Sequence, residues 1–200
     1  MTAEIAPSIV VELTAPIAII RFNRPELRNP LSIHTLQELT HVTAAVFPRE
    51  DVQAVIFTGR DDVFASGANI RELGRLDPAT ALEFAKFGQD LFQRIAEAKQ
   101  LTIAAINGFC MGGGLDLALA CDIRVASKFA VFSHPGARLG IITGWGGTQR
   151  LPRLIGRARA LEFFTTARRY SSEAALEMGL VSRVADPVIE CARQLAKNIG

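Results

Sequence analysis

The stretch LTIAAINGFCMGGGLDLALACDIRVAS, residues 101–127, decides the fold. Its apolar run 101–106 is typical of a buried strand, and the run 115–120 after the glycines is typical of a buried helix. A helix N-terminus carries unpaired N–H groups and a partial positive charge, and glycines let another molecule approach that backbone closely. We therefore expect a strand–turn–helix unit with a candidate anion or oxyanion site at the helix start. The alternative is a tight turn that serves packing alone.

The rest of the chain alternates strands and helices. Proline 16 joins two β-branched runs, which predicts a hairpin, while Ser32 and Asp77 are typical N-caps. Mostly apolar strands that are covered on both faces favour α/β layering. The expected elements are strands 8–13, 17–22, 54–59, 122–127 and 130–133, helices starting at Ser32 and Asp77, a helix over 171–178, a last helix after Asp186, and loops over 24–32 and 60–69.

Composition narrows the class of protein. Of the 200 residues, 49% are hydrophobic and 21% are charged, and the net charge is +2. This fits one globular domain with a real core and gives no electrostatic attraction to nucleic acid. No apolar run reaches the roughly 18–20 residues of a membrane span, and the N-terminus has no basic secretory region, so we expect a cytoplasmic protein with no membrane partner. The spacing of the three cysteines and three histidines matches no metal site, and we expect no metal and no cofactor.

The glycines at 112–114 fit neither the G-x-G-x-x-G nor the G-x-x-x-x-G-K phosphate motif, which disfavours a nucleotide-binding domain. Together with the flanking segments, however, they resemble the crotonase family, the enoyl-CoA hydratase/isomerase proteins. The resemblance covers most of residues 8–199. It rests on NRPELRNPLS (23–32), FASGANIREL (64–73), AAINGFCMGGGLDLALACDIRVAS (104–127), FSHPGARLGIITGWGGTQRLPRLIG (132–156) and SSEAALEMGLVSRV (171–184), in one consistent order.

The resemblance implies an α/β fold, a crotonase-like spiral of repeated β-β-α units with helices covering the sheets. Residues 1–200 would form a single crotonase-like domain. Family chains usually continue further, so we expect this sequence to lack most of the family's C-terminal helical region, which covers the acyl site. The resemblance also implies a homo-oligomer, a trimer or a dimer of trimers.

The family binds acyl-CoA thioesters and stabilises an enolate-like oxyanion with two backbone N–H groups. Carried over by motif, these donors belong to Ser66 and Gly113. The first position is usually alanine in the family, a change that a backbone donor tolerates. Contacts to CoA are expected from Arg28 and from the loop Ser66-Gly67-Ala68-Asn69, where Asn69 replaces the usual aspartate. The alternative for Arg28 is an ordinary exposed arginine.

Two positions depart from the hydratase pattern of paired glutamates that hold a water. The first glutamate is replaced by Asp116, which is shorter by roughly 1.5 Å. The second is replaced by Gly136. A displacement of about 1 Å can cost on the order of 100-fold in rate, and a missing acid or base costs about 10²–10⁴-fold. Hydration by two carboxylates is therefore doubtful, and Asp116 is either the catalytic acid or a first-turn acid favoured by the helix dipole.

Two further side chains are candidates for the same pocket. His134 lies two residues before Gly136 and is a candidate replacement for its carboxylate, although a polar residue of the pocket wall is the more common case. Trp145 lies where the family lines its acyl pocket, and either narrows the cavity, stacks on a flat acyl group or only packs. His34 and His41 are expected to lie on the early helix, without a role.

Three functions follow from these residues. The first is an enoyl-CoA hydratase-like enzyme in which Asp116 moves the proton of a thioester enolate. One-acid chemistry, either double-bond isomerisation or decarboxylation, fits the same residues. The third is a non-catalytic acyl-CoA-binding protein, which the glycine at 136 and the short C-terminus favour.

Overall fold

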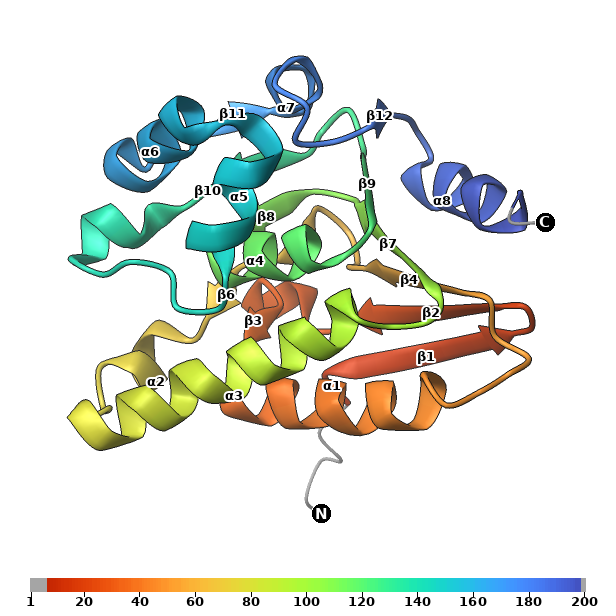
Figure 1. Ribbon diagram of the computed structural model, residues 1–200, viewed down its shortest axis with the longest axis horizontal. Coiled ribbons are helices and arrows are strands. Elements are labelled where there is room, and N and C mark those ends of the chain that lie inside the picture. Colours follow the sequence, from red (N-terminus) through yellow and green to blue (C-terminus); the bar gives the residue numbers. More distant parts are fainter. Residues whose placement is uncertain (1–6, 199–200) are drawn as a thin grey trace.

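The structure, a computed structural model that describes residues 7–198, has a six-stranded sheet at its centre (Figure 1). Strands β1 (Ile9–Thr14) and β2 (Ile17–Phe22) form the expected antiparallel hairpin at one edge. The remaining neighbours pair in parallel. They follow in the order β4 (Ala54–Thr58), β7 (Leu101–Ile106), β9 (Ile123–Ala126) and β12 (Arg183–Val184).

Two smaller sheets complete the strand layers. One has the order β11 (Tyr170–Ser171), β10 (Val131–Ser133), β8 (Phe109–Met111) and β5 (Val63–Ala65), and the other pairs β3 (Pro30–Leu31) with β6 (Gly67–Ala68). Three times in succession, the chain forms one strand of the six-stranded sheet, then one strand of the four-stranded sheet, and then a helix. These units end in α3 (Pro78–Ala96), α4 (Gly113–Ala120) and α5 (Gly147–Ile155). The spiral of β-β-α units is therefore confirmed.

Helix starts follow the local chemistry of the sequence. The hydroxyl of Ser32 accepts a hydrogen bond from the Thr35 N–H at the start of α1 (Ile33–Val46). Asp77 and Thr80 form a reciprocal capping box at the start of α3. Further along, the chain forms short α2 (Ile70–Leu73), then α6 (Arg157–Thr166), α7 (Ser172–Glu177) and α8 (Val188–Lys197), with two 3₁₀ turns, η1 (Pro25–Leu27) and η2 (Pro135–Leu139).

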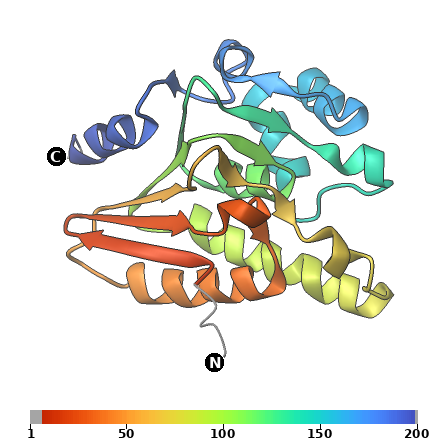
Figure 2. The ribbon, with the colours of Figure 1, turned by 180° about the vertical axis from the view of Figure 1, so that it is seen from behind.

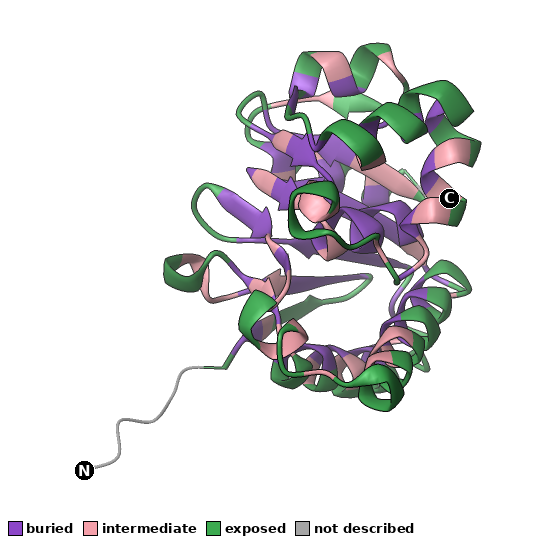
Figure 3. Ribbon diagram, turned by 90° about the vertical axis from the view of Figure 1, so that its left-hand side faces the viewer, coloured by how far each residue is buried: buried purple, intermediate pink, exposed green. Residues whose placement is uncertain are grey.

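Alternate side chains of the large sheet enter two separate cores. Side chains such as Ile20 and Phe57 point to the main core, which is shared with α1, α3 and α4, whereas Ile19 and Ile56 point to a smaller core beneath α8. Figure 2 shows α1 beside the hairpin and α8 on the same side of the molecule as the hairpin turn. There the Arg193 Nη2 on α8 lies 3.7 Å from the Glu12 Oε2 on β1. In Figure 3 the buried residues concentrate on the strands, and the outer helices carry exposed faces. Helix α4 is buried over nearly its full length, which fixes its N-terminus inside the protein.

Several expectations need correction. The expected polar loop 60–69 contains the buried strands β5 and β6, and the turn after β7 contains β8. Loop 24–32 contains η1 and β3, and α4 starts at Gly113 rather than at residue 115. Helices α5 and α6 were not expected at all, because α5 begins after two glycines and contains Pro152, which are signals of a loop. Over residues 7–198, none of the helices combines the length and apolar character that a membrane crossing requires.

Candidate functional site

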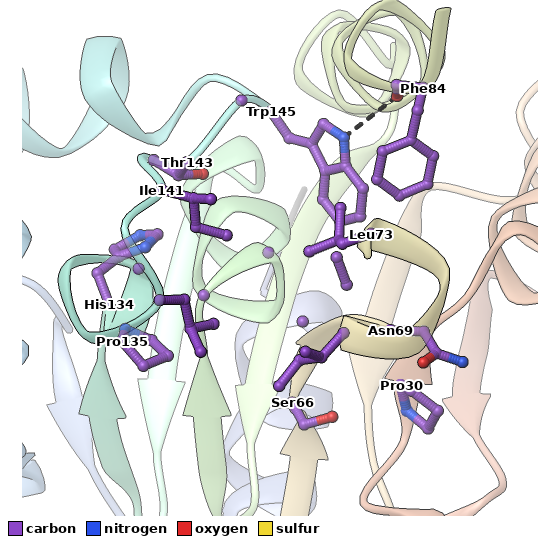
Figure 4. A pocket seen from close by; sticks show the side chains of 18 of the residues that line it. Pro30, Ser66, Asn69, Leu73, Phe84, His134, Pro135, Ile141, Thr143 and Trp145 are labelled. Atoms are coloured by element: carbon purple, nitrogen blue, oxygen red, sulfur yellow. Dashed lines mark hydrogen bonds between the residues drawn. The ribbon is translucent and has the colours of Figure 1, made fainter. Parts of the chain in front are cut away.

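A cavity of about 770 Å³ opens beside the start of α4, next to the paired strands β3 and β6 (Figure 4). Its walls come from η1 and β3, β6 and α2, the first half of α3, the start of α4, and the segment 134–145. The rim carries exposed apolar side chains that soluble proteins usually bury, which suits a ligand with an apolar portion. These rim residues are Leu27, Ile70, Leu139, Ile141 and Ile142.

All of the substrate-binding residues expected from the sequence line this cavity. Segments far apart in the chain supply them, so the fold brings them together. They are Arg28, Ser66, Gly67, Ala68, Asn69, Gly113, His134, Gly136 and Trp145. Asp116, which was expected as the catalytic acid, is fully buried and does not line the cavity.

Helix α4 presents its first N–H group at the cavity wall. Gly113 is the first residue of the helix, so its N–H has no acceptor within the helix, and it makes no hydrogen bond to another residue of the described chain. Gly67 packs directly against it with φ +90°, and a Cβ on Gly67 would lie 2.8 Å from the Gly113 nitrogen. A glycine is therefore needed at position 67, both for its backbone conformation and for this close approach.

The second expected donor, Ser66, is already engaged. Its N–H donates to the Asn29 carbonyl oxygen over 3.2 Å, at the long end of the usual range. The Asn29 side chain in turn donates to the carbonyl oxygens of Val63 and Phe64, which ties this loop to β5. In this structure Gly113 is the unpaired donor, and Ser66 must share or exchange its hydrogen bond to serve a ligand.

At the outer rim, Arg28 is held by two neighbours. Its Nη1 lies 3.0 and 2.9 Å from the two carboxylate oxygens of Asp62, and its guanidinium lies 4.5 Å from the centre of the Phe109 ring. Both members of the ion pair remain largely exposed, so the arginine is accessible to an anionic ligand. Asn69 has a structural role besides lining the cavity, since its side chain accepts from the Arg71 N–H as the N-cap of α2.

Trp145 lines the cavity and is also tightly packed. Its ring meets Phe84 and Phe92 with centroid distances of 5.2 and 5.6 Å, and its N–H donates to the Phe84 carbonyl oxygen over 3.4 Å (Figure 4). The indole lies directly over the α-carbons of Gly88 and Gly113, where an added Cβ would come within 2.3 and 2.4 Å of it. The packing and cavity-lining interpretations of this residue both hold.

Gly136 lies in η2 with its α-carbon against the following segment. A Cβ there would lie 2.6 Å from the Ile141 carbonyl oxygen, and the Ile141 N–H donates to the Gly136 carbonyl oxygen over 3.0 Å. The backbone thus occupies the space that a side chain at position 136 needs. Because of this contact, a glutamate cannot be accommodated here unless segment 136–141 moves.

Behind the cavity wall, Asp116 forms a buried polar cluster. It accepts a hydrogen bond from the Thr143 hydroxyl at Oδ2, and its Oδ1 lies 3.1 Å from the His134 Nε2. Gly147 packs its α-carbon against the carboxylate, since a Cβ there would lie 2.0 Å from Oδ1. His134 is only 3% exposed but lines the cavity, so it stands between the carboxylate and the space for a ligand.

Two other ionisable groups lie within electrostatic reach of Asp116. Burial raises the pKa of the Cys110 thiol well above its usual value, and the Asp116 charge raises it further. Burial lowers the pKa of Arg150 on α5, while Asp116 opposes that shift. In the described part of the chain, no group of three or more His, Cys, Asp or Glu side chains is placed to hold a metal ion.

Sequence reasoning missed three residues that shape the site. Thr143 binds Asp116, Asp62 binds Arg28, and Asn29 binds the Ser66 N–H. Proline on both sides of the 26–29 segment signalled a special loop, and Asn29 has φ +46°, a conformation that asparagine tolerates. No pattern in the sequence signalled the other two.

Comparison with known proteins agrees with this geometry. The family model described as enoyl-CoA hydratase/isomerase matches residues 12–200. The chain is 36% identical over 195 residues to a short-chain-enoyl-CoA hydratase of Clostridium acetobutylicum, covering 96% of this chain and 75% of that protein. It is 39% identical over 181 residues to a crotonyl-CoA hydratase of Syntrophomonas wolfei, covering 90% and 70%. A crystal structure of enoyl-CoA hydratase from Bacillus anthracis superposes with a TM-score of 0.91 at 36% identity, covering 96% of this chain and 76% of that one.

Proposed function

The chain belongs to the enoyl-CoA hydratase/isomerase family, and from this premise we propose that it adds water to the double bond of short-chain α,β-unsaturated acyl-CoA thioesters. The observation that carries the proposal is the unpaired Gly113 N–H at the wall of an apolar-rimmed cavity. As water adds to the β-carbon, negative charge develops on the thioester oxygen. A fixed N–H at a helix start stabilises that charge without reorganising.

Ser66 is proposed as the second donor of this oxyanion hole. Its bond to Asn29 is long, so a more strongly charged oxygen competes well for the same proton. Removal of one such donor costs about 2.7–4 kcal/mol of barrier. Arg28 is proposed to bind the anionic part of CoA at the rim. The rim of leucine and isoleucine side chains suits the apolar parts of the thioester.

Two relatives support a short acyl chain by their printed names, which are short-chain-enoyl-CoA hydratase and crotonyl-CoA hydratase. Trp145 supports the same conclusion, because its bulky indole takes up part of the cavity wall. The doubt about hydration that Asp116 and Gly136 raised from the sequence is not supported by these relatives. Double-bond isomerisation is the second candidate, because position 136 is a glycine rather than a second carboxylate and a single acid–base group is sufficient for that reaction.

The test is turnover of crotonyl-CoA, followed as loss of the conjugated-enoyl absorbance and by identification of 3-hydroxybutyryl-CoA. We expect hydration that saturates with substrate. A β,γ-unsaturated acyl-CoA, assayed beside it, reports isomerisation. Calorimetric binding of an acyl-CoA with no turnover of either substrate would refute the enzyme and favour a binding protein. The homo-oligomer and the cytoplasmic location also remain predictions.

A further inference from the structure

We propose that His134 is the acid–base residue of this site and that Asp116 acts behind it as a positioning residue. The inference rests on the proposed function, since it assigns the proton transfers of the same cavity. It also departs from the expectation that Asp116 itself contacts the substrate.

The first observation is where the two side chains lie. Asp116 is 0% exposed and its two carboxylate oxygens face Thr143 and His134. A general acid or base must come within hydrogen-bond reach of the atom that it serves, directly or through one water. Of the two side chains, only His134 lines the cavity (Figure 4).

The second observation is an unsatisfied pair of buried atoms. The His134 Nε2 and the Asp116 Oδ1 are both buried and lie 3.1 Å apart, yet the ring N–H is not aligned for a hydrogen bond, and neither atom has another partner in the described chain. A buried polar group without a hydrogen-bond partner destabilises the folded state, so the pair favours completing this contact. The two atoms are nevertheless within hydrogen-bond distance of each other.

The third observation is the missing carboxylate. The Ile141 carbonyl oxygen fills the space beside Gly136, so segment 134–141 presents the His134 imidazole at the wall instead of a carboxylate at position 136. Histidine is the side chain that ordinarily changes charge between pH 5 and 8, so it is suited to taking and returning a proton.

The proposed step is balanced without a further reactant. The neutral His134 ring takes a proton from the attacking water through the nitrogen that does not face Asp116. The oxygen–carbon bond forms at the β-carbon, and the π electrons move to the thioester oxygen near the Gly113 N–H. The imidazolium then returns the proton to the α-carbon as the enolate collapses. Asp116 keeps the ring oriented and stabilises the imidazolium, as the carboxylate does in an Asp–His pair of hydrolases.

Other groups around the pair affect its pH dependence. The Phe164 ring packs on His134 with a centroid distance of 5.0 Å and carries no charge. Arg150 on α5 and Cys110 on β8 interact electrostatically with Asp116. Burial raises the pKa of Cys110 well above its ordinary value, so a change in activity between pH 5 and 8 does not report that thiol.

The decisive variants are His134→Gln and Asp116→Asn. Glutamine can place its amide nitrogen near the position of Nε2, which keeps a donor toward Asp116 but removes proton transfer. We expect kcat to fall about 10²–10⁴-fold with KM little changed, and the acid limb of the pH–rate profile to disappear. Asp116→Asn should retain that limb but move it to lower pH, because a neutral amide no longer stabilises the imidazolium. His41→Gln, an exposed histidine on α1, is the matched control.

A second readout separates this inference from the proposed function. Exchange of the α-protons of butyryl-CoA in deuterated water measures proton transfer at the α-carbon without hydration. If the parent exchanges but does not hydrate, hydration is wrong, and loss of exchange in His134→Gln still supports the inference. A folded His134→Gln with kcat within about three-fold of the parent overturns it, as does a parent that neither hydrates nor exchanges. If His134→Gln does not fold, His134→Asn and the pH shift in Asp116→Asn decide, and an unshifted acid limb overturns the inference.

Discussion

Replacing Gly67 by alanine should reduce turnover much more than it reduces stability. Gly67 has φ +90°, and its new Cβ would lie 2.8 Å from the Gly113 nitrogen and 2.9 Å from the Met111 carbonyl oxygen. These are backbone atoms of α4 and β8, so no side-chain rotation relieves the contact. The strand β6 and the start of α4 must move apart, and the Gly113 N–H moves with them.

The magnitude follows from these contacts. Ordinary van der Waals contact of a Cβ begins at 3.4 Å, so the separation needed is about 0.6 Å. Misplacement of about 1 Å can cost on the order of 100-fold in rate, and full loss of an oxyanion donor costs about 10²–10³-fold. We expect kcat to fall roughly 10- to 100-fold. The left-handed conformation adds a cost of about 1–2 kcal/mol to the folded state.

The variant Gly179→Ala isolates the cost of the left-handed backbone conformation from the movement of the Gly113 N–H. Gly179 has φ +78° after α7, with no atom of residues 7–198 within 4 Å of an added Cβ, and it does not line the cavity. It should lose a similar conformational energy in urea denaturation but keep the parent kcat for crotonyl-CoA. If folded Gly67→Ala shows a kcat within about two-fold of Gly179→Ala, the placement of the Gly113 N–H does not control the reaction.

Three further changes test the rest of the site. Trp145→Phe should raise kcat/KM for octenoyl-CoA relative to crotonyl-CoA by roughly ten-fold or more, since each newly buried methylene contributes about 0.8 kcal/mol; an unchanged ratio refutes a role of Trp145 in limiting the acyl chain. Gly136→Glu should not increase hydration, because its Cβ meets the Ile141 carbonyl oxygen at 2.6 Å, and a faster enzyme contradicts this packing. Burial raises the pKa of Cys121 from 9.0 to about 12. Its contribution to stability is therefore complete below pH 9 and is lost as the pH rises toward 12, by up to about 1.4 kcal/mol per pH unit. Cys121→Ala should weaken the decline in urea midpoint over that range, and an equal decline in both proteins refutes the argument.

Strong local signals made much of the fold predictable. The hairpin, the buried strands β4 and β7, and the caps at Ser32 and Asp77 follow from apolar runs and capping chemistry. The strands β5, β6 and β8 did not follow, because each has only two or three residues and is defined by its neighbours in space. Helix α5 was missed because its packing overrides Pro152 and the glycines before it.

The residues of the site likewise divide into those that the sequence predicted and those that depend on three-dimensional packing. The family motifs identified the cavity-lining positions, since each lies in a segment with its own signature. They did not show that Asp116 is buried behind the cavity wall with its carboxylate bound by Thr143, because that contact joins residues 27 positions apart. The 3.1 Å approach of His134 to Asp116 likewise depends on how β10 and α4 sit together in three dimensions.

The indole of Trp145 lies over two glycines from different helices, Gly88 on α3 and Gly113 on α4. This arrangement makes the order of mutations important. While the tryptophan is present, neither glycine can gain a side chain without displacing it, and loss of the tryptophan removes the closest contacts at both positions. A library that varies one position at a time will therefore find the two glycines intolerant of change. Varying all three positions together is the way to reach other shapes of this cavity.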